Sequence, residues 1–210
     1  TPGGGFGYMG YGGSGINTNK DIGTNFNIAP SKKIKINGSV GYAKNKTRNE
    51  SRGESYTSLL DRYSSNSNTN ITRGENVTPR VSLNWNPDSL TTVIFRTDMG
   101  ISKNENHSFS ADSSHTTGQD PTIGFSRFWS ESTSFQFNNH LSVVRRLNKD
   151  GRNIRIGLNN RYNKSDEDGS NYSETAYPGI SDPTIIDNIS KTKSSTNAYG
   201  LSLGYVEPFG

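Results

Sequence analysis

Six segments of the chain place apolar side chains at every second position, with polar side chains between them. In chain order these residues are Ile34, Ile36, Val40 and Tyr42; Val77, Val81, Leu83 and Trp85; Val93, Phe95, Met99 and Ile101; Phe135, Phe137, Leu141 and Val143; Ile154, Ile156, Leu158 and Tyr162; and Tyr199, Leu201, Leu203 and Tyr205. A period of two gives a β-strand one apolar and one polar face. Most of these segments span about nine residues, the length with which a tilted strand crosses a bilayer.

The connections between the segments alternate between short turns and long polar stretches. Turn residues gather at 29–32, 86–89, 148–151 and 207–210, whereas polar stretches fill 45–75, 103–132 and 164–194. A Gly-rich strand at 3–12 and a strand at 22–28 precede the first short turn. The pattern predicts an all-β antiparallel meander of about eight long strands. Short turns on one side and long loops on the other are typical of a transmembrane barrel of the outer-membrane type, with the long loops extracellular.

The long polar stretches need not be loops throughout. Residues 67–72 alternate in character, which suggests strands that continue past the membrane, and a structureless loop of that length is unusual. Aromatic residues agree with a membrane setting. Trp85 and Tyr205 lie near short turns, and Tyr42, Tyr162 and Tyr199 lie near the long stretches, as two interfacial belts would.

Composition narrows the class of protein. Only 28% of the 210 residues are hydrophobic, and the mean hydropathy is -0.82. A soluble sandwich of this length normally has a richer core, whereas a barrel with a polar lumen tolerates such a composition. Disorder fits poorly, because 10% of residues are aromatic and the apolar residues are phased. With 0 cysteines there is no disulfide scaffold, and a net charge of +4 from scattered Lys and Arg gives no nucleic-acid footprint.

Three stretches resemble a known family. Residues 84–96 (NWNPDSLTTVIFR), 203–210 (LGYVEPFG) and 7–12 (GYMGYG) look like turns and strands of the outer-membrane β-barrel family of Bacteroidetes, which is related to TonB-dependent receptors. The resemblance implies uptake of an unknown ligand across the bacterial outer membrane, energised by a TonB-type partner. No plug domain is recognisable, so residues 1–210 are expected to be a segment of one barrel domain, completed by further strands and a plug of the same protein. Outer-membrane lipid is the other expected partner.

The polar positions of the strands supply the candidate site. If the apolar face meets lipid, these charged residues face the lumen: Lys33, Lys35, Arg80, Arg96, Asp98, Arg146, Arg155 and Arg161. One interpretation is a wall that pairs with a plug or with further strands. The other is a basic lumen that favours an anionic ligand. Three residues, Arg145, Asn139 and Asn160, fall on the apolar face instead, where Arg145 could extend from its place near a turn to the membrane interface.

Catalytic and metal sites find little support in the sequence. The acidic run at 166–171 makes Asp166 and Asp168 a weak calcium candidate, but Lys164 and Thr175 stand where a calcium loop needs carboxylates. His107, His115 and His140 lack partners at metal-ligand spacing. No nucleophile motif occurs, so we expect neither an enzyme nor a cofactor.

Two functions from different classes remain open. The first is part of a TonB-dependent transporter, and the second is a secreted or surface-exposed soluble β-rich adhesin or structural module. A sandwich buries its apolar faces between two sheets, while a barrel turns them to lipid. The barrel predicts outward-pointing, exposed side chains at Ile36, Val81, Leu83, Phe95, Phe137, Ile156 and Leu201. It also predicts that the first and last strands do not pair, because the residues form only an arc of a wider barrel.

Overall fold

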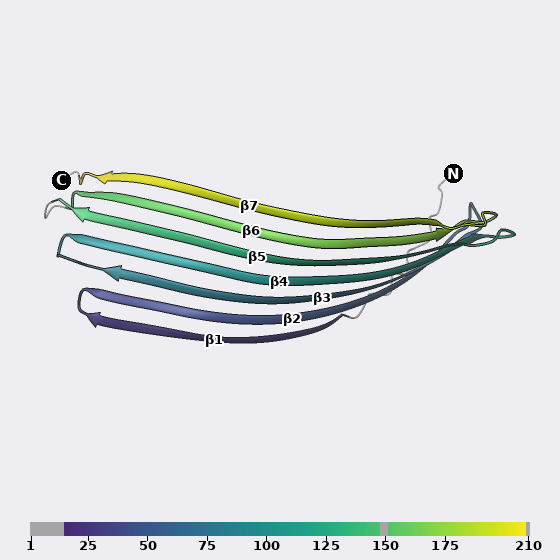
Figure 1. The fold of residues 1–210 in the computed structure, drawn as a ribbon, viewed down its shortest axis with the longest axis horizontal. Helices are drawn as coiled ribbons and strands as arrows, with labels where there is room; N and C mark the ends of the chain where they lie inside the picture. The colour runs from purple at the N-terminus through teal and green to yellow at the C-terminus, as the bar shows by residue number, and fades with distance from the viewer. Residues whose placement is uncertain (1–14, 148–150, 209–210) are drawn as a thin grey trace, which may run out of the picture.

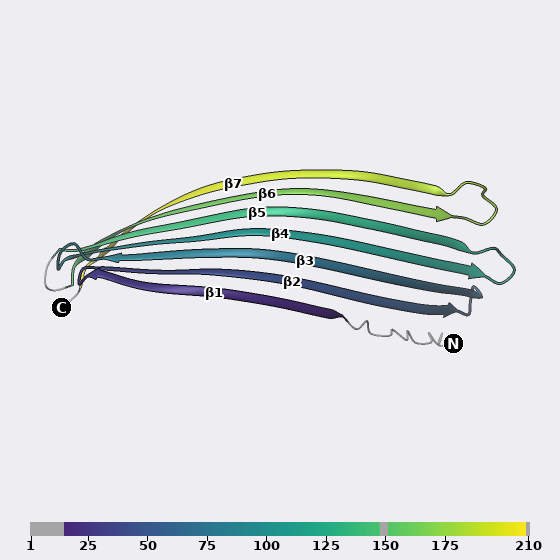
Figure 2. The same ribbon diagram turned by 60° about the horizontal axis from the view of Figure 1, so that its bottom comes forward.

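The computed structural model describes residues 15–147 and 151–208, and they form one sheet of very long strands. The seven strands are β1 (Ile16–Ser31), β2 (Ile34–Thr57), β3 (Arg62–Trp85), β4 (Thr91–Thr116), β5 (Thr122–Arg146), β6 (Asn153–Ala176) and β7 (Thr184–Val206). They lie side by side in a single curved layer (Figures 1 and 2). Within the described residues there is no helix long and apolar enough to cross a membrane.

The strands follow one another in chain order, and every neighbouring pair is antiparallel. The predicted all-β antiparallel meander is therefore confirmed. The sheet is open, because β1 and β7 lie at its two edges and do not pair with each other. The Gly-rich strand expected at residues 3–12 lies outside the described residues, so its part in the closure prediction is not tested.

The prediction of three long polar loops is wrong. Residues 45–57 and 62–75 pair with each other without interruption, and the connection between β2 and β3 is only 58–61. The other two connections at this end are 117–121 and 177–183. The ladders continue through these polar stretches because the backbone N–H and C=O groups find partners in the neighbouring strand. The alternation noted at 67–72 was the correct indication.

Each of these three connections contains one residue in the left-handed backbone region. They are Asp61, with φ of 46°, Gly118, with φ of 82°, and Gly179, with φ of 72°. Glycine adopts this conformation without steric cost, and aspartate tolerates it better than most residues. The Asp61 carboxylate accepts a hydrogen bond of 2.7 Å from the Tyr56 hydroxyl, which ties the turn to the end of β2.

The short turns lie at the opposite end of the sheet, as the sequence predicts, although one of them is displaced. β1 runs through Pro30 to Ser31, and the turn consists of Lys32 and Lys33 rather than residues 29–32. The register shifts between Ile28 and Ser31, an irregularity that accommodates a proline without a ladder hydrogen bond. The turn at 86–90 and the end of β7 at Val206 match the expectation, and residues 148–150 lie outside the described residues.

Pairing assigns every side chain to one of two faces, since directly paired residues share a face. The apolar face comprises even-numbered residues of β1, β2 and β6 and odd-numbered residues of β3, β4, β5 and β7; the other positions form the polar face. Near the short turns the apolar face carries a continuous apolar band, made by residues 22–28, 34–42, 77–85, 93–101, 135–143, 154–162 and 199–205.

Nothing within the described residues packs against the apolar band. No hydrophobic side chain there is buried, so this sheet has no core of the kind a sandwich needs. The seven residues predicted to point outward all lie in the band. Val81, Ile156 and Leu201 are exposed, the last by 66%. The other four, Ile36, Leu83, Phe95 and Phe137, are half-buried, because neighbours on the same face flank them.

Candidate functional site

Two rows of polar side chains cross the centre of the polar face, each following the pairing from strand to strand. The first row is Asn27, Asn37, Ser82, Arg96, His140 and Asn159, and the second is Asn25, Ser39, Arg80, Asp98, Asn138 and Arg161. The rows lie at the level of the middle of the apolar band on the opposite face. We call these twelve residues the polar wall.

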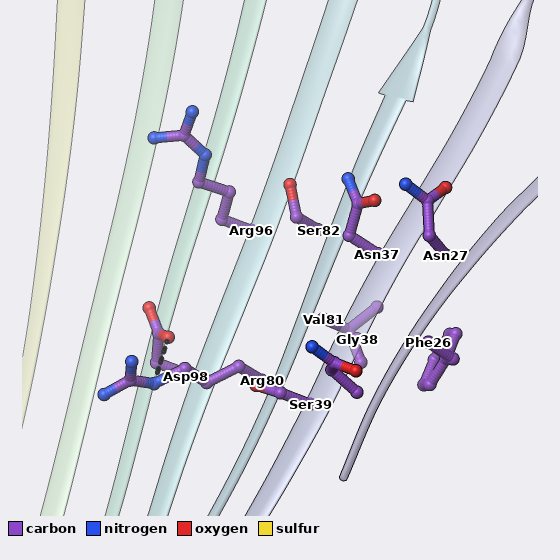
Figure 3. Close-up of a pocket in the computed structure, with 11 residues that line it drawn as sticks. Phe26, Asn27, Asn37, Gly38, Ser39, Arg80, Val81, Ser82, Arg96 and Asp98 are labelled. Carbon is purple, nitrogen blue, oxygen red and sulfur yellow. Dashed lines mark ion pairs between the residues drawn. The ribbon is translucent and has the colours of Figure 1, made fainter.

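The polar wall has one internal ion pair and one further internal side-chain hydrogen bond, which fix its geometry. Arg80 Nε lies 3.3 Å from Asp98 Oδ1, between neighbouring strands β3 and β4 (Figure 3). His140 Nδ1 lies 2.6 Å from Asn159 Oδ1. Arg96 forms no ion pair with any described residue, and its guanidinium lies apart from the Arg80–Asp98 pair in Figure 3. Its donors are therefore available to an incoming group.

Three shallow hollows on this face meet at Asp98. Their volumes are about 490, 580 and 360 Å³; Arg80 lines the first two, and Arg96 lines the first and third. Guanidinium and amide groups line them, and guanidinium forks match carboxylate and phosphate oxygens in a bidentate way. The arrangement can bind and orient a polar, anionic group. It does not gather a nucleophile with a base, and no cluster of three potential metal ligands occurs among the described residues.

All the predicted lumen residues in strands lie on the polar face, but only some of them lie together. Arg80, Arg96, Asp98 and Arg161 belong to the polar wall. Lys35, Arg146 and Arg155 lie nearer the short turns, and Lys33 lies in a turn, where its Nζ donates to Pro87 O at 2.7 Å. The sequence analysis did not name the Asn residues and His140 of the polar wall as candidate site residues. Each of those in β2, β5 and β6 lies an even number of positions from a predicted lumen lysine or arginine of the same strand, which places it on the polar face.

The polar residues on the apolar face have partners in the structure. Arg145 Nη1 donates to Asp88 Oδ2 at 3.0 Å and to Thr91 Oγ1 at 2.5 Å, so it reaches the β3–β4 turn. The backbone N–H of Leu90 also donates to Asp88, at 2.8 Å. This last hydrogen bond is the main cause that lowers the pKa of the Asp88 carboxyl, and the hydroxyl of Thr91 and the charge of Arg145 add to it.

An amide ladder accounts for Asn139 and Asn160. Asn139 Nδ2 donates to Asn160 Oδ1 at 3.4 Å, and Asn160 Nδ2 donates to Asn197 Oδ1 at 2.8 Å. The ladder ends where Asn197 donates to the Tyr199 hydroxyl at 2.8 Å. Asn139 Oδ1 is buried without a partner at the other end. Each amide of the ladder thus makes one hydrogen bond to the next side chain inside an otherwise apolar surface.

Beyond the apolar band, two further rows on the apolar face form a charged belt that crosses all seven strands. One row is Lys20, Lys44, Glu75, Lys103, Thr133, Asp166 and Lys193, and the other is Thr18, Lys46, Arg73, Glu105, Glu131, Asp168 and Lys191. Ion pairs link its middle, including Lys44–Glu75 at 2.5 Å and Lys103–Glu131 at 2.8 Å.

Charge neighbours in the belt shift the pKa values of its members. The carboxylate of Glu131, which accepts a hydrogen bond from Lys103, raises the pKa of that lysine. Arg73 donates to Glu105 and lowers the pKa of its carboxyl. The calcium candidates Asp166 and Asp168 belong to this belt and lie in β6, not in a turn. Lys164 lies 3.3 Å from Asp166, and Lys191 lies 4.0 Å from Asp168.

Comparison with known proteins gives weak structural likeness only. No protein-family model matches the sequence, and a search of curated proteins finds no match. The open form of the ferric-catecholate import receptor Fiu from E. coli K12 is 7% identical, with a TM-score of 0.35 over 91% of this chain and 47% of that one. The ferric yersiniabactin uptake receptor FyuA from Yersinia pestis is 10% identical, with a TM-score of 0.23 over 93% and 44%. For the copper transporter OprC the values are 7%, 0.17, 90% and 50%.

This chain spans about half the length of each of those structures. Likeness at such TM-scores does not establish a shared fold or function. The resemblance to the Bacteroidetes barrel family thus stays a prediction from the sequence, and the function proposed below rests on the two faces of the sheet.

Proposed function

We propose that this sheet is an arc of a transmembrane β-barrel in the bacterial outer membrane, within a receptor that takes up a ligand. The observation that carries the proposal is the apolar band, which is present on every strand and has no core behind it. A sheet with an exposed apolar face in water would aggregate through that face. In a bilayer the same face meets hydrocarbon and is stable.

The height of the band fits a bilayer. Nine residues of β-strand span about 30 Å, which tilting reduces toward the roughly 25 Å of the apolar zone on outer-membrane barrels. Aromatic side chains mark both margins, with Trp85 41% exposed at the short-turn margin and Tyr199 79% exposed at the other. Such aromatic residues settle at the level of lipid headgroups.

The margin of the band farther from the short turns follows one row of paired residues from Ile22 in β1 to Phe135 in β5, and moves toward the short turns in β6 and β7. The pairing leads from Ile22 in β1 to Ser195 in β7, yet the band of β7 begins at Tyr199, closer to the short turns. The displacement corresponds to about 13 Å along the strand. When the strands tilt in the membrane, residues paired across the sheet lie at different depths in the bilayer. The membrane surface then crosses the rows of paired residues at an angle.

The polar wall supports the uptake of an anionic ligand. It combines Arg80, Arg96 and Arg161 with a single carboxylate, Asp98, on the face that a barrel turns to its lumen. By the sequence resemblance, a plug and further strands of the same protein complete the barrel, and a TonB-type partner energises it. The ends of the sheet bearing residues 58–61, 117–121 and 177–183 then face the outside of the cell.

A surface adhesin is the alternative, and it needs something to cover the band. Burial of exposed side chains such as Ile156 and Leu158, which are 42% and 47% exposed, would require a second layer. None exists among the described residues. The alternative would gain support if the full-length protein stayed soluble without detergent.

Cysteine labelling along β4 tests the membrane arrangement directly, because these 210 residues contain 0 cysteines. We expect Arg96→Cys and Asp98→Cys in the full-length protein, reconstituted in vesicles, to react with a water-soluble maleimide. Phe95→Cys and Thr97→Cys should resist it, because their side chains face hydrocarbon. Equal reactivity at all four positions would contradict the bilayer placement.

Uptake assays test the role of the polar wall. We expect the triple variant Arg80→Gln, Arg96→Gln and Arg161→Gln to lose uptake of phosphorylated or carboxylated solutes by cells, while neutral solutes are unaffected. The matched control replaces Arg73 and Lys103 of the charged belt on the other face. A loss that is the same for the wall and the belt variants would contradict a ligand path along the polar wall.

A further inference from the structure

The charged belt opposes like charges directly in two places. In one of them Glu105, Glu131 and Asp168 are neighbours across strands, and Lys103 and Lys191 lie within ion-pair distance of them. In the other the opposed charges are cations. Lys20 of β1 pairs with Lys44 of β2, and in the next row Lys46 of β2 pairs with Arg73 of β3. Directly opposite side chains in a sheet lie within about 5.5 Å at their Cβ atoms, and like charges there are destabilising. Elsewhere in the same two rows, lysines oppose carboxylates, as Lys193 does Asp166 and Lys191 does Asp168.

Carboxylates near this region are too few to neutralise it. Glu75 lies 2.5 Å from Lys44, and Glu105 lies 3.3 Å from Arg73 and is shared with Lys103. Arg48, one row further out, is paired with Glu50. Lys20 and Lys46 have no carboxylate within ion-pair distance among the described residues. Residues 1–15, which precede β1, contain no charged side chain at all.

The region lies directly against the apolar band. On the apolar face of β1, Lys20 is the neighbour of Ile22 on the side away from the short turns. Lys44 has the same position next to Tyr42 on β2. If the band spans the hydrocarbon, the ammonium groups lie at the level of the lipid headgroups of the outer leaflet. Headgroup phosphates are the anions concentrated at that level, and a phosphate between two lysines converts their repulsion into attraction.

We propose that Lys20, Lys44, Lys46 and Arg73 form a binding site for the phosphate of an anionic membrane lipid. The inference rests on the proposed membrane location, because it takes the phosphate from a lipid headgroup and not from solution. The lysine stems lie along the margin of the band, so the acyl chains of the same lipid would contact Ile22 and Tyr42.

Lipid selectivity of the full-length protein tests the site. The protein is reconstituted in phosphatidylcholine vesicles that contain a minor fraction of spin-labelled phosphatidylglycerol, and the fraction of immobilised label is measured. We expect the wild type to prefer phosphatidylglycerol, and Lys20→Gln with Lys46→Gln to reduce that preference on the order of tenfold. Sodium phosphate should displace the lipid no better than sodium chloride at equal ionic strength.

The matched control is Lys191→Gln with Lys193→Gln, which removes two lysines from the same face and the same rows. These lysines oppose carboxylates and lie far from the band, so lipid preference should be unchanged. An equal loss in both variants, no preference in the wild type, or selective displacement by phosphate would each overturn the site. Failure of the protein to float with the vesicles would instead refute the proposed membrane function, a result that flotation separates from the others.

Discussion

Leu201→Arg is expected to lower the stability of the inserted barrel by about 2–4 kcal/mol, the cost of an arginine near the bilayer midplane on the lipid face of a barrel. Leu201 is 66% exposed and lies in the interior of the band on β7, so its replacement faces hydrocarbon. The measurement is the free energy of unfolding by denaturant of the full-length protein in lipid vesicles, together with its yield in the membrane fraction.

Ser202→Arg is the matched control, one residue further on the same strand but on the polar face. The nearest positions on that face are Gly157 across the ladder and Gly200 and Gly204 along β7, which leave room for the long side chain. We expect little change in stability, because the guanidinium there meets water. Equal destabilisation by the two arginines would mean that protein covers the polar face of β7 as well as its apolar face.

The amide ladder predicts an unusual order of stabilities. Asn160→Leu alone should destabilise the sheet, because it leaves the amide of Asn139 without any partner on an apolar surface. The double variant Asn139→Leu and Asn160→Leu should instead be more stable than the wild type by about 1–2 kcal/mol, because it removes the buried oxygen of Asn139 that has no partner. The same unfolding measurement in vesicles checks both values.

Adjacent asparagines provide the control for this pair. Asn138 and Asn159 precede the ladder residues in the sequence and lie on the polar face, where Asn159 bonds His140. Their double replacement by leucine should bring no gain in stability. If the ladder variant is less stable than the wild type, the amides are needed at that surface, and a partner other than lipid covers it.

The apolar band could be predicted from the sequence, whereas the outer halves of the strands were indicated only by the alternation at 67–72. The strong period of two appears in Ile34, Ile36, Val40 and Tyr42, because each second residue lies on the apolar face of the sheet. Beyond the belt both faces meet water, so stretches such as 64–70 contain serine, threonine and asparagine on both sides. Their strand structure comes from cross-strand backbone pairing, which leaves no hydrophobic signal in the chain.

The register limits what the sequence says about the site. The side of the sheet on which Arg80, Arg96 and Arg161 lie follows from counting along each strand. Their neighbours across strands depend on where each turn falls, and placing the first turn at 29–32 instead of at Lys32–Lys33 shifts every pair of β1 and β2. The sequence alone therefore does not show that Lys20 lies directly opposite Lys44.

The strands extend far beyond the band, and this determines how the outer part of the protein meets its surroundings. β4 has 26 residues, so more than half of its length lies beyond the apolar band as paired backbone. Proteases cleave chains in extended, unpaired form, and ladder backbone resists them. Between β2 and β7, the described backbone of the outer half that belongs to no ladder is confined to three turns, at 58–61, 117–121 and 177–183. Protease treatment of whole cells should therefore cleave the chain at these three turns and leave the paired strands next to them intact.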